Sequence, residues 1–86
     1  MDEFKKPLEL FSSYLKYEKN YSRDTIKNYT LDLEKFMNYL RDFNLDKLSA
    51  VSTELIQNYI NMLNRSGLTP TSLSRKASSI RSLFSF

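Results

Sequence analysis

The chain has 86 residues, 41% of them hydrophobic and 14% aromatic, which suffices for one small domain with a core and argues against intrinsic disorder. With no cysteine and no histidine it lacks disulfides, Cys/His metal sites and an imidazole base, so its composition favours a binding module over an enzyme. The net charge is only +3, and no three apolar residues are consecutive, so we expect a soluble, cytoplasmic chain with no membrane-spanning or signal segment.

The first half of the chain predicts two helices, over residues 7–19 and 22–42, because apolar residues recur every three or four positions. Pro7 suits the first turn of the earlier helix. Ser22 can cap the later one, and Asp24 places a negative charge where the helix dipole favours it. The faces expected to be buried are Phe4, Leu8, Phe11 and Leu15, followed by Ile26, Tyr29, Leu33, Phe36, Met37 and Leu40.

Residues 42–51 have no sustained helical period and predict a connection, after which helices are predicted over 53–66 and 70–85. Ser52 and Thr69 are the expected N-caps, and Gly67 stands where a left-handed residue would end the third helix. The buried faces should be Leu55, Ile56, Tyr59, Ile60 and Leu63, then Leu73, Ala77, Ile80 and Phe84. The chain therefore predicts an all-α fold, one compact four-helix domain spanning residues 1–86.

The surplus of positive charge lies entirely in the last quarter of the chain. Residues 1–66 carry ten basic and ten acidic residues, whereas residues 67–86 carry three basic residues, no acid and many hydroxyls. Opposite the predicted core face, the fourth helix gathers Thr71, Arg75, Ser78 and Ser82, flanked by Ser74 and Arg81, with Lys76 on the other shoulder. Such a face suits duplex DNA, although an ordinary solvated face remains the alternative.

Other features leave alternatives open. The polar residues at the start of the second helix form either a second surface for contact with a partner or simply the N-terminal cap of that helix. Leu31 points with the polar side of that helix, as an edge contact or a partner contact. Leu10, Tyr14 and Tyr17 widen the first helix's apolar surface, for packing or for a protein partner. The pair Asp32/Glu34 does not share a helix face and is interpreted as solvated surface.

Nothing in the sequence supports catalysis by this chain. No Ser/His/Asp or Cys/His set is present, and there is no glycine-rich phosphate loop. We therefore expect no catalytic residue, no bound cofactor and no metal.

Two ordered motifs, at residues 21–33 and 67–84, together resemble the N-terminal core-binding domain of tyrosine recombinases, above all the Xer and phage-integrase branch. The first motif carries Ser22, Thr25-Ile26, Tyr29 and Asp32-Leu33; the second carries Arg75, Ala77-Ser78 and Ile80-Arg81-Ser82. The resemblance covers essentially the whole chain. It implies a four-helix SAM-like domain that forms half of a C-shaped clamp around DNA, with the second and fourth helices facing the major groove of a recombination half-site.

The resemblance implies contacts to DNA from both of these helices. Carried onto this chain, they are Ser22, Arg23, Thr25, Lys27 and Asn28, with Thr71, Ser72, Ser74, Arg75, Lys76, Ser78, Ser79, Arg81 and Ser82. Contacts to other recombinase protomers in a synaptic complex would come from Leu10, Tyr14 and Tyr17 of the first helix, and the isolated domain should be monomeric. The alternative is a helical protein-interaction module that does not bind DNA.

The chain departs from the family pattern at two places. Thr30 and Leu31 follow the motif tyrosine where family members often carry basic residues. The sequence also stops at Phe86, where family proteins continue into a catalytic domain. The resemblance thus implies that the catalytic domain is absent here and that this chain alone does not cleave DNA.

Overall fold

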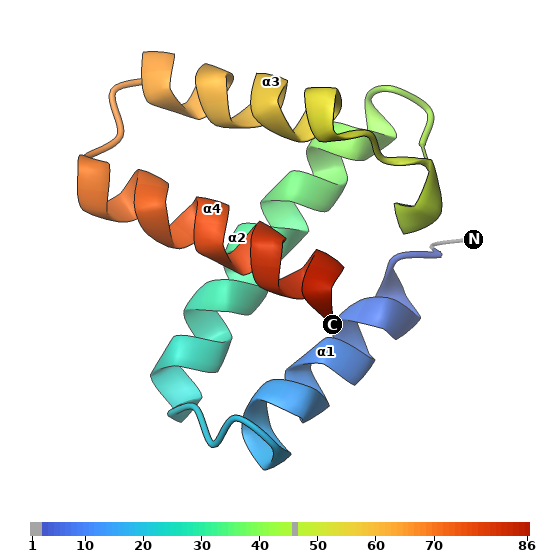
Figure 1. Cartoon of the computed structure of the whole chain (residues 1–86), viewed down its shortest axis with the longest axis vertical. Coiled ribbons are helices and arrows are strands. Elements are labelled where there is room, and N and C mark those ends of the chain that lie inside the picture. The colour runs from blue at the N-terminus through green and yellow to red at the C-terminus, as the bar shows by residue number, and fades with distance from the viewer. Residues whose placement is uncertain (1–2, 46) are drawn as a thin grey trace.

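The computed structural model describes residues 3–45 and 47–86, and in this part of the chain it contains only helices. The α-helices are α1 (Lys5–Tyr17), α2 (Arg23–Arg41), α3 (Thr53–Arg65) and α4 (Pro70–Ser85), with a 3₁₀ turn, η1 (Leu48–Ala50), between α2 and α3 (Figure 1). The all-α, four-helix prediction is confirmed. The predicted bounds hold to within about two residues, the usual uncertainty at helix ends.

Three helices begin where the sequence predicted, because a hydroxyl at each N-cap accepts a backbone N–H that lacks a helical partner. Ser22 accepts from the N–H of residue 25 at 3.2 Å, Ser52 from that of residue 55 at 3.1 Å, and Thr69 from that of residue 72 at 3.2 Å. Gly67 has φ +91°, as expected for a left-handed residue after α3.

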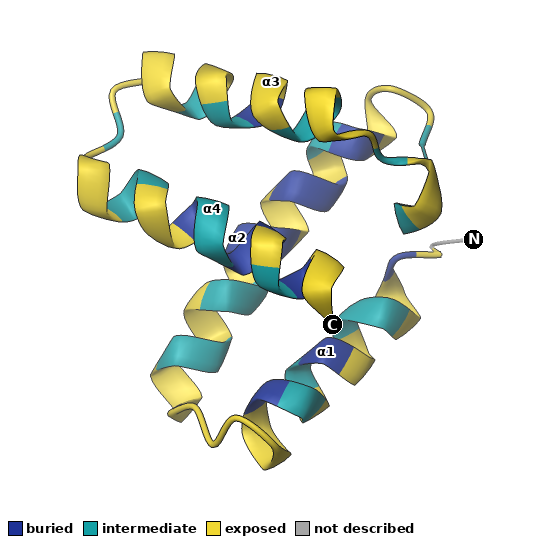
Figure 2. Cartoon of the chain, viewed as in Figure 1, coloured by how far each residue is buried: buried dark blue, intermediate teal, exposed yellow. Residues whose placement is uncertain are grey.

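Helix α2 is the element on which the others assemble. Figure 1 shows α4 crossing α2 near its middle, while α1 packs against α2 and α3 runs beside α4. The core lies between these helices and is formed by the apolar faces predicted for α1 and α2 together with parts of α3 and α4 (Figure 2). Rings of α2 and α3 meet there: the centroid of Tyr59 lies 5.0 Å from that of Phe36 and 4.8 Å from that of Tyr39.

The buried face of α4 differs from the prediction. Ile80 is buried as expected, but Leu73 and Ala77 are only partly buried and Phe84 is 39% exposed. Instead, the side of α4 that includes Lys76, Ser79 and Leu83 faces inward. The helix is rotated because it packs on α2 as well as on α3, and apolar periodicity could not foresee that polar side chains would be satisfied on the α2 side.

None of the helices in the described ranges has an apolar stretch of the length and hydropathy that crossing a bilayer requires.

Candidate nucleic-acid interface

A buried carboxylate joins the middle of α2 to α4. Asp32 is 5% exposed, and its Oδ2 accepts from Arg75 Nε at 2.9 Å. Its Oδ1 accepts from Arg75 Nη2 at 3.3 Å and from Lys76 Nζ at 2.7 Å. Burying a charge is costly unless it is paired and hydrogen-bonded, and these three charge-assisted bonds satisfy that condition. The interpretation of Asp32 as solvated surface is therefore wrong.

Two of the side chains predicted to contact DNA are buried on the inward side of α4. Lys76 is only 8% exposed, and Ser79 is fully buried with its hydroxyl donating to the Lys76 carbonyl at 2.8 Å. The expectation that these residues face outward is wrong, because Lys76 reaches Asp32 of α2 and Ser79 has no exposed surface. Asp32 also offsets one of the three positive charges of residues 67–86, so two remain to act on a partner.

Arg75 is the member of this cluster that reaches solvent. Its side chain is 41% exposed, whereas the side chain of Asp32 is 4% exposed. The hydrogen bonds to Asp32 and the negative charge of that carboxylate raise the pKa of Arg75 above its ordinary value. The guanidinium therefore stays charged and anchored at the border between α2 and α4.

The outward side of α4 is polar along its length and carries no acid. We call the following residues the α4 polar face: Thr71, Ser74, Arg75, Ser78, Arg81 and Ser82. Thr71, Ser74, Arg75 and Arg81 are exposed, and Ser78 and Ser82 are partly buried. Ser72 is partly buried, and its hydroxyl accepts from the Thr69 hydroxyl at 3.1 Å.

A groove of ≈ 270 Å³ separates the second half of the α4 polar face from the connection between α1 and α2. No aspartate or glutamate is among the described residues that line it. Its polar lining consists of Lys19, Tyr21, Ser78, Arg81, Ser82 and Ser85, and its walls are completed by Tyr14, Leu15 and Phe86. Two cations among hydroxyls form a surface that suits phosphate oxygens.

Lys19 and Tyr21 were not predicted as site residues. Lys19 lies beyond the C-terminal end of α1, directly before Asn20, whose φ of 54° turns the chain toward α2. Its Nζ lies 5.9 Å from the centroid of the Tyr14 ring. The only signal in the sequence was a basic and an aromatic residue in a helix connection. That signal does not reveal that the connection lies opposite Arg81.

The predicted DNA-contacting residues at the start of α2 lie on different sides of that helix. At about 100° per residue, Thr25 and Asn28 lie on the side of α2 that carries Asp32, toward α4. Arg23 and Lys27 lie roughly 140–180° around the helix from Asp32, so they are not brought together with Arg75. Ser22 is exposed, but its hydroxyl already accepts the capping N–H and pairs with the Thr25 hydroxyl at 2.9 Å.

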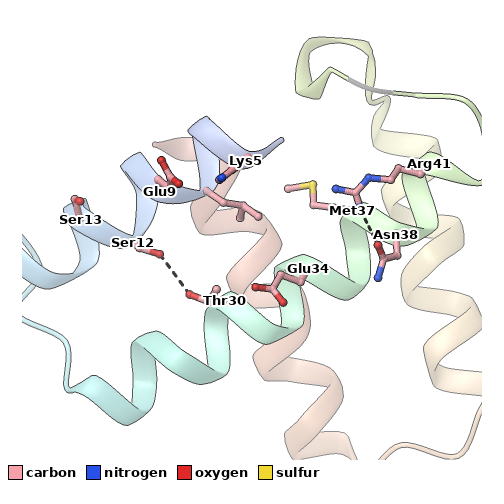
Figure 3. A pocket seen from close by; sticks show the side chains of 10 residues that line it. Lys5, Glu9, Ser12, Ser13, Thr30, Glu34, Met37, Asn38 and Arg41 are labelled. Carbon is pink, nitrogen blue, oxygen red and sulfur yellow. Dashed lines mark hydrogen bonds between the residues drawn. The ribbon is translucent and has the colours of Figure 1, made fainter. Parts of the chain in front are cut away.

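The far side of α2 borders a second hollow, of ≈ 660 Å³, between α1 and α2 (Figure 3). Basic Lys5 and Arg41 line it together with acidic Glu9 and Glu34. Within its lining the hydroxyls of Ser12 and Thr30 pair at 3.4 Å. The two signs of charge make this hollow a poor match for a phosphate backbone, unlike the groove beside α4.

The residues of α1 that were predicted to contact another protomer differ in their exposure. Leu10 is 52% exposed and Tyr17 is 70% exposed. Tyr14 is partly buried, and its ring packs 4.9 Å from that of Phe86 and 6.2 Å from that of Phe11, measured between centroids. Leu31 of α2 is 45% exposed, as its position on the polar side predicted.

In residues 3–45 and 47–86, no group of three or more metal-ligating side chains gathers.

Comparison with known families identifies the fold. The model of the "Phage integrase, N-terminal SAM-like domain" family matches residues 8–86. The chain belongs to this family. No solved structure gives a significant match.

The relatives of this SAM-like domain are tyrosine recombinases. Tyrosine recombinase XerC of Halalkalibacterium halodurans is 37% identical over 76 residues, which cover 88% of this chain and 25% of the relative. XerC of Staphylococcus saprophyticus is 40% identical over 72 residues, covering 84% and 24%, and XerC of Oceanobacillus iheyensis is 34% identical over 86 residues, covering 100% and 28%. The chain thus spans about a quarter of the length of these relatives. It corresponds to their SAM-like domain and not to a catalytic domain.

Proposed function

We propose that this SAM-like domain is the part of a tyrosine recombinase that grips duplex DNA at a recombination half-site. In this proposal the catalytic residues belong to another domain of the recombinase. The observation that carries the proposal is the groove between Lys19 and Arg81, whose described lining contains no aspartate or glutamate and which continues into the α4 polar face. The names of the relatives, all recombinases, supply the class of substrate.

In this proposal the groove holds the DNA backbone. The side chains of Lys19 and Arg81 neutralise phosphate charges, while the short hydroxyls of Ser78 and Ser82 donate to phosphate oxygens. Small residues on the outward side of α4 let the helix approach the duplex closely. On α2, Thr25 and Asn28 are better placed to join this contact than Arg23 and Lys27, because they lie on the side that faces α4.

The number of cations sets the expected salt dependence. Each phosphate neutralised on duplex DNA contributes about −0.9 to the slope of log K against log salt concentration. With Lys19 and Arg81 as the cations that contact phosphates, the slope should be roughly −2. Such a small slope implies modest affinity for the domain alone.

Fluorescence anisotropy of the 86-residue chain on a labelled duplex, measured at several salt concentrations, tests the proposal. Lys19→Ala and Arg81→Ala should each weaken binding and reduce the slope by about one. Lys47→Ala is the matched control, since Lys47 is exposed, stands at the N-cap of η1 and is not among the residues that line the groove. Affinity that does not change with salt, or equal loss in Lys47→Ala, would contradict the proposal.

The exposed side of α1 favours a second role in the same assembly. Leu10 and Tyr17 present apolar surface that the domain itself does not cover, and tyrosines of this kind are common in protein interfaces. We propose that they contact a neighbouring protomer once DNA has brought two copies together. Sedimentation should show a monomer without DNA, and Leu10→Ser/Tyr17→Ser should reduce cooperative loading on long duplexes without changing single-copy affinity. If sedimentation instead shows stable association in the absence of any DNA binding, the chain is a protein-interaction module.

A further inference from the structure

One edge of the Arg75 guanidinium is occupied and the other is not. Nε and Nη2 form the inner edge, and both donate to the carboxylate of Asp32, at 2.9 and 3.3 Å. Among the described residues none bonds to Nη1. The outer edge, made by Nη1 and the second N–H of Nη2, therefore keeps a pair of parallel donors.

The group that holds the inner edge cannot easily move. Asp32 is buried at 5% exposure, and Lys76 Nζ fixes its Oδ1 at 2.7 Å. Because Arg75 is held by two bonds to a fixed carboxylate, most of the rotational freedom that a long side chain loses on binding is lost before any partner arrives. The outer edge is thus preoriented on a side chain that is 41% exposed.

The charge of the cluster argues for recognition of a base over recognition of a phosphate. Asp32 lies against the inner edge and weakens the attraction of Arg75 for an anion, but it leaves the donor geometry of the outer edge intact. Two parallel N–H donors match the O6 and N7 acceptors of guanine in the major groove, the commonest specific contact of arginine with DNA. Thr71 and Ser78, one turn to either side on α4, are short and would not hold the helix away from base edges.

We propose that Arg75 reads a guanine through its outer edge, and that Asp32 is the positioning residue that makes this possible. This inference rests on the proposed binding of α4 to duplex DNA. It adds that sequence preference comes from the Asp32–Arg75 pair, while Lys19 and Arg81 supply affinity that is independent of sequence.

Selection of bound duplexes from a pool with randomised sequence, followed by sequencing, tests the proposal. The wild-type chain should enrich a guanine at one position by on the order of tenfold over the other bases. Arg75→Lys keeps the positive charge but loses the parallel donors, and Arg75→Ala loses both. Each should abolish the guanine preference, and the Lys76–Asp32 ion pair remains in both variants to keep the fold. Arg81→Ala, the control, should bind more weakly with the same preference.

Asp32→Asn separates positioning from a purely structural role. It removes a negative charge beside the duplex, so affinity for random duplexes, corrected for the folded fraction, should be unchanged or higher. The guanine preference should nevertheless fall, because the amide holds the guanidinium less firmly. A purely structural role would leave the preference intact in the molecules that fold.

Two results would overturn this inference alone: a guanine preference that survives Arg75→Lys, or a loss in Arg75→Ala that is equal on all sequences. The second result would mean that Arg75 holds a phosphate. If the wild-type chain bound no duplex at all, the proposed function would fail and this inference with it.

Discussion

The Asp32 cluster should be the most sensitive polar feature of the fold, and Asp32→Asn tests this. The substitution keeps the size of the side chain but leaves the ammonium of Lys76, 8% exposed, without an opposite charge. Removing one partner of a buried ion pair costs about 3–5 kcal/mol. The Arg75 side chain is 41% exposed and can be hydrated, so it adds little to this cost. We expect a loss of about 3 kcal/mol in the free energy of unfolding.

This loss is large for a domain of this size, whose total stability should be about 4–13 kcal/mol. At about 4–8 °C per kcal/mol, it corresponds to a fall in Tm of about 12–24 °C. Urea unfolding followed by far-ultraviolet circular dichroism measures it, provided that the m-value stays that of the wild-type chain.

Two further variants locate the origin of the cost. Arg75→Ala should lose less than about 1 kcal/mol, because Lys76 keeps its bond to Asp32. The double variant Asp32→Leu/Lys76→Met replaces the buried pair by apolar groups and should recover most of the stability. The reasoning would be refuted if Asp32→Asn unfolded within about 1 kcal/mol of the wild-type chain, or if Arg75→Ala cost as much as Asp32→Asn.

Two other predictions concern the backbone and alkaline pH. Gly67→Ala should cost about 1 kcal/mol in urea unfolding, from backbone strain at φ +91° alone, since a Cβ there meets nothing within 4 Å; an unchanged midpoint would contradict this. Burial raises the pKa of Tyr59, and the charge of Asp32 and the neighbouring Tyr39 raise it further. Below about pH 10, Tyr59 should therefore not lower the free energy of unfolding. As the pH rises from there toward the folded-state pKa, the free energy of unfolding should fall, because Tyr59 ionises readily only in the unfolded chain. Unfolding titrations should show a shallower alkaline loss of the free energy of unfolding for Tyr59→Phe, and a loss as steep as that of the wild-type chain would contradict this.

The helices and their beginnings could be predicted from the sequence because they depend on neighbours within one or two turns. Apolar residues every three or four positions define α1, α2 and α3, and the hydroxyls of Ser22, Ser52 and Thr69 each lie three residues before the N–H that they accept. Gly67 ends α3 by its own conformational freedom. Such local signals also give the charge asymmetry and the polar side of α4.

Only the tertiary structure decided which polar residues remain available. Asp32 and Arg75 are 43 positions apart, and the angle at which α4 crosses α2 brings them together. That crossing turns Lys76 and Ser79 inward, although both lie in the segment that carries the whole positive surplus. It also places Arg81 across a groove from Lys19. Lys19 lies in the connection between α1 and α2, and the composition of that connection did not mark it as part of a site. Local sequence determines how a helix is built, but the rotation of a helix about its axis depends on every surface it packs against.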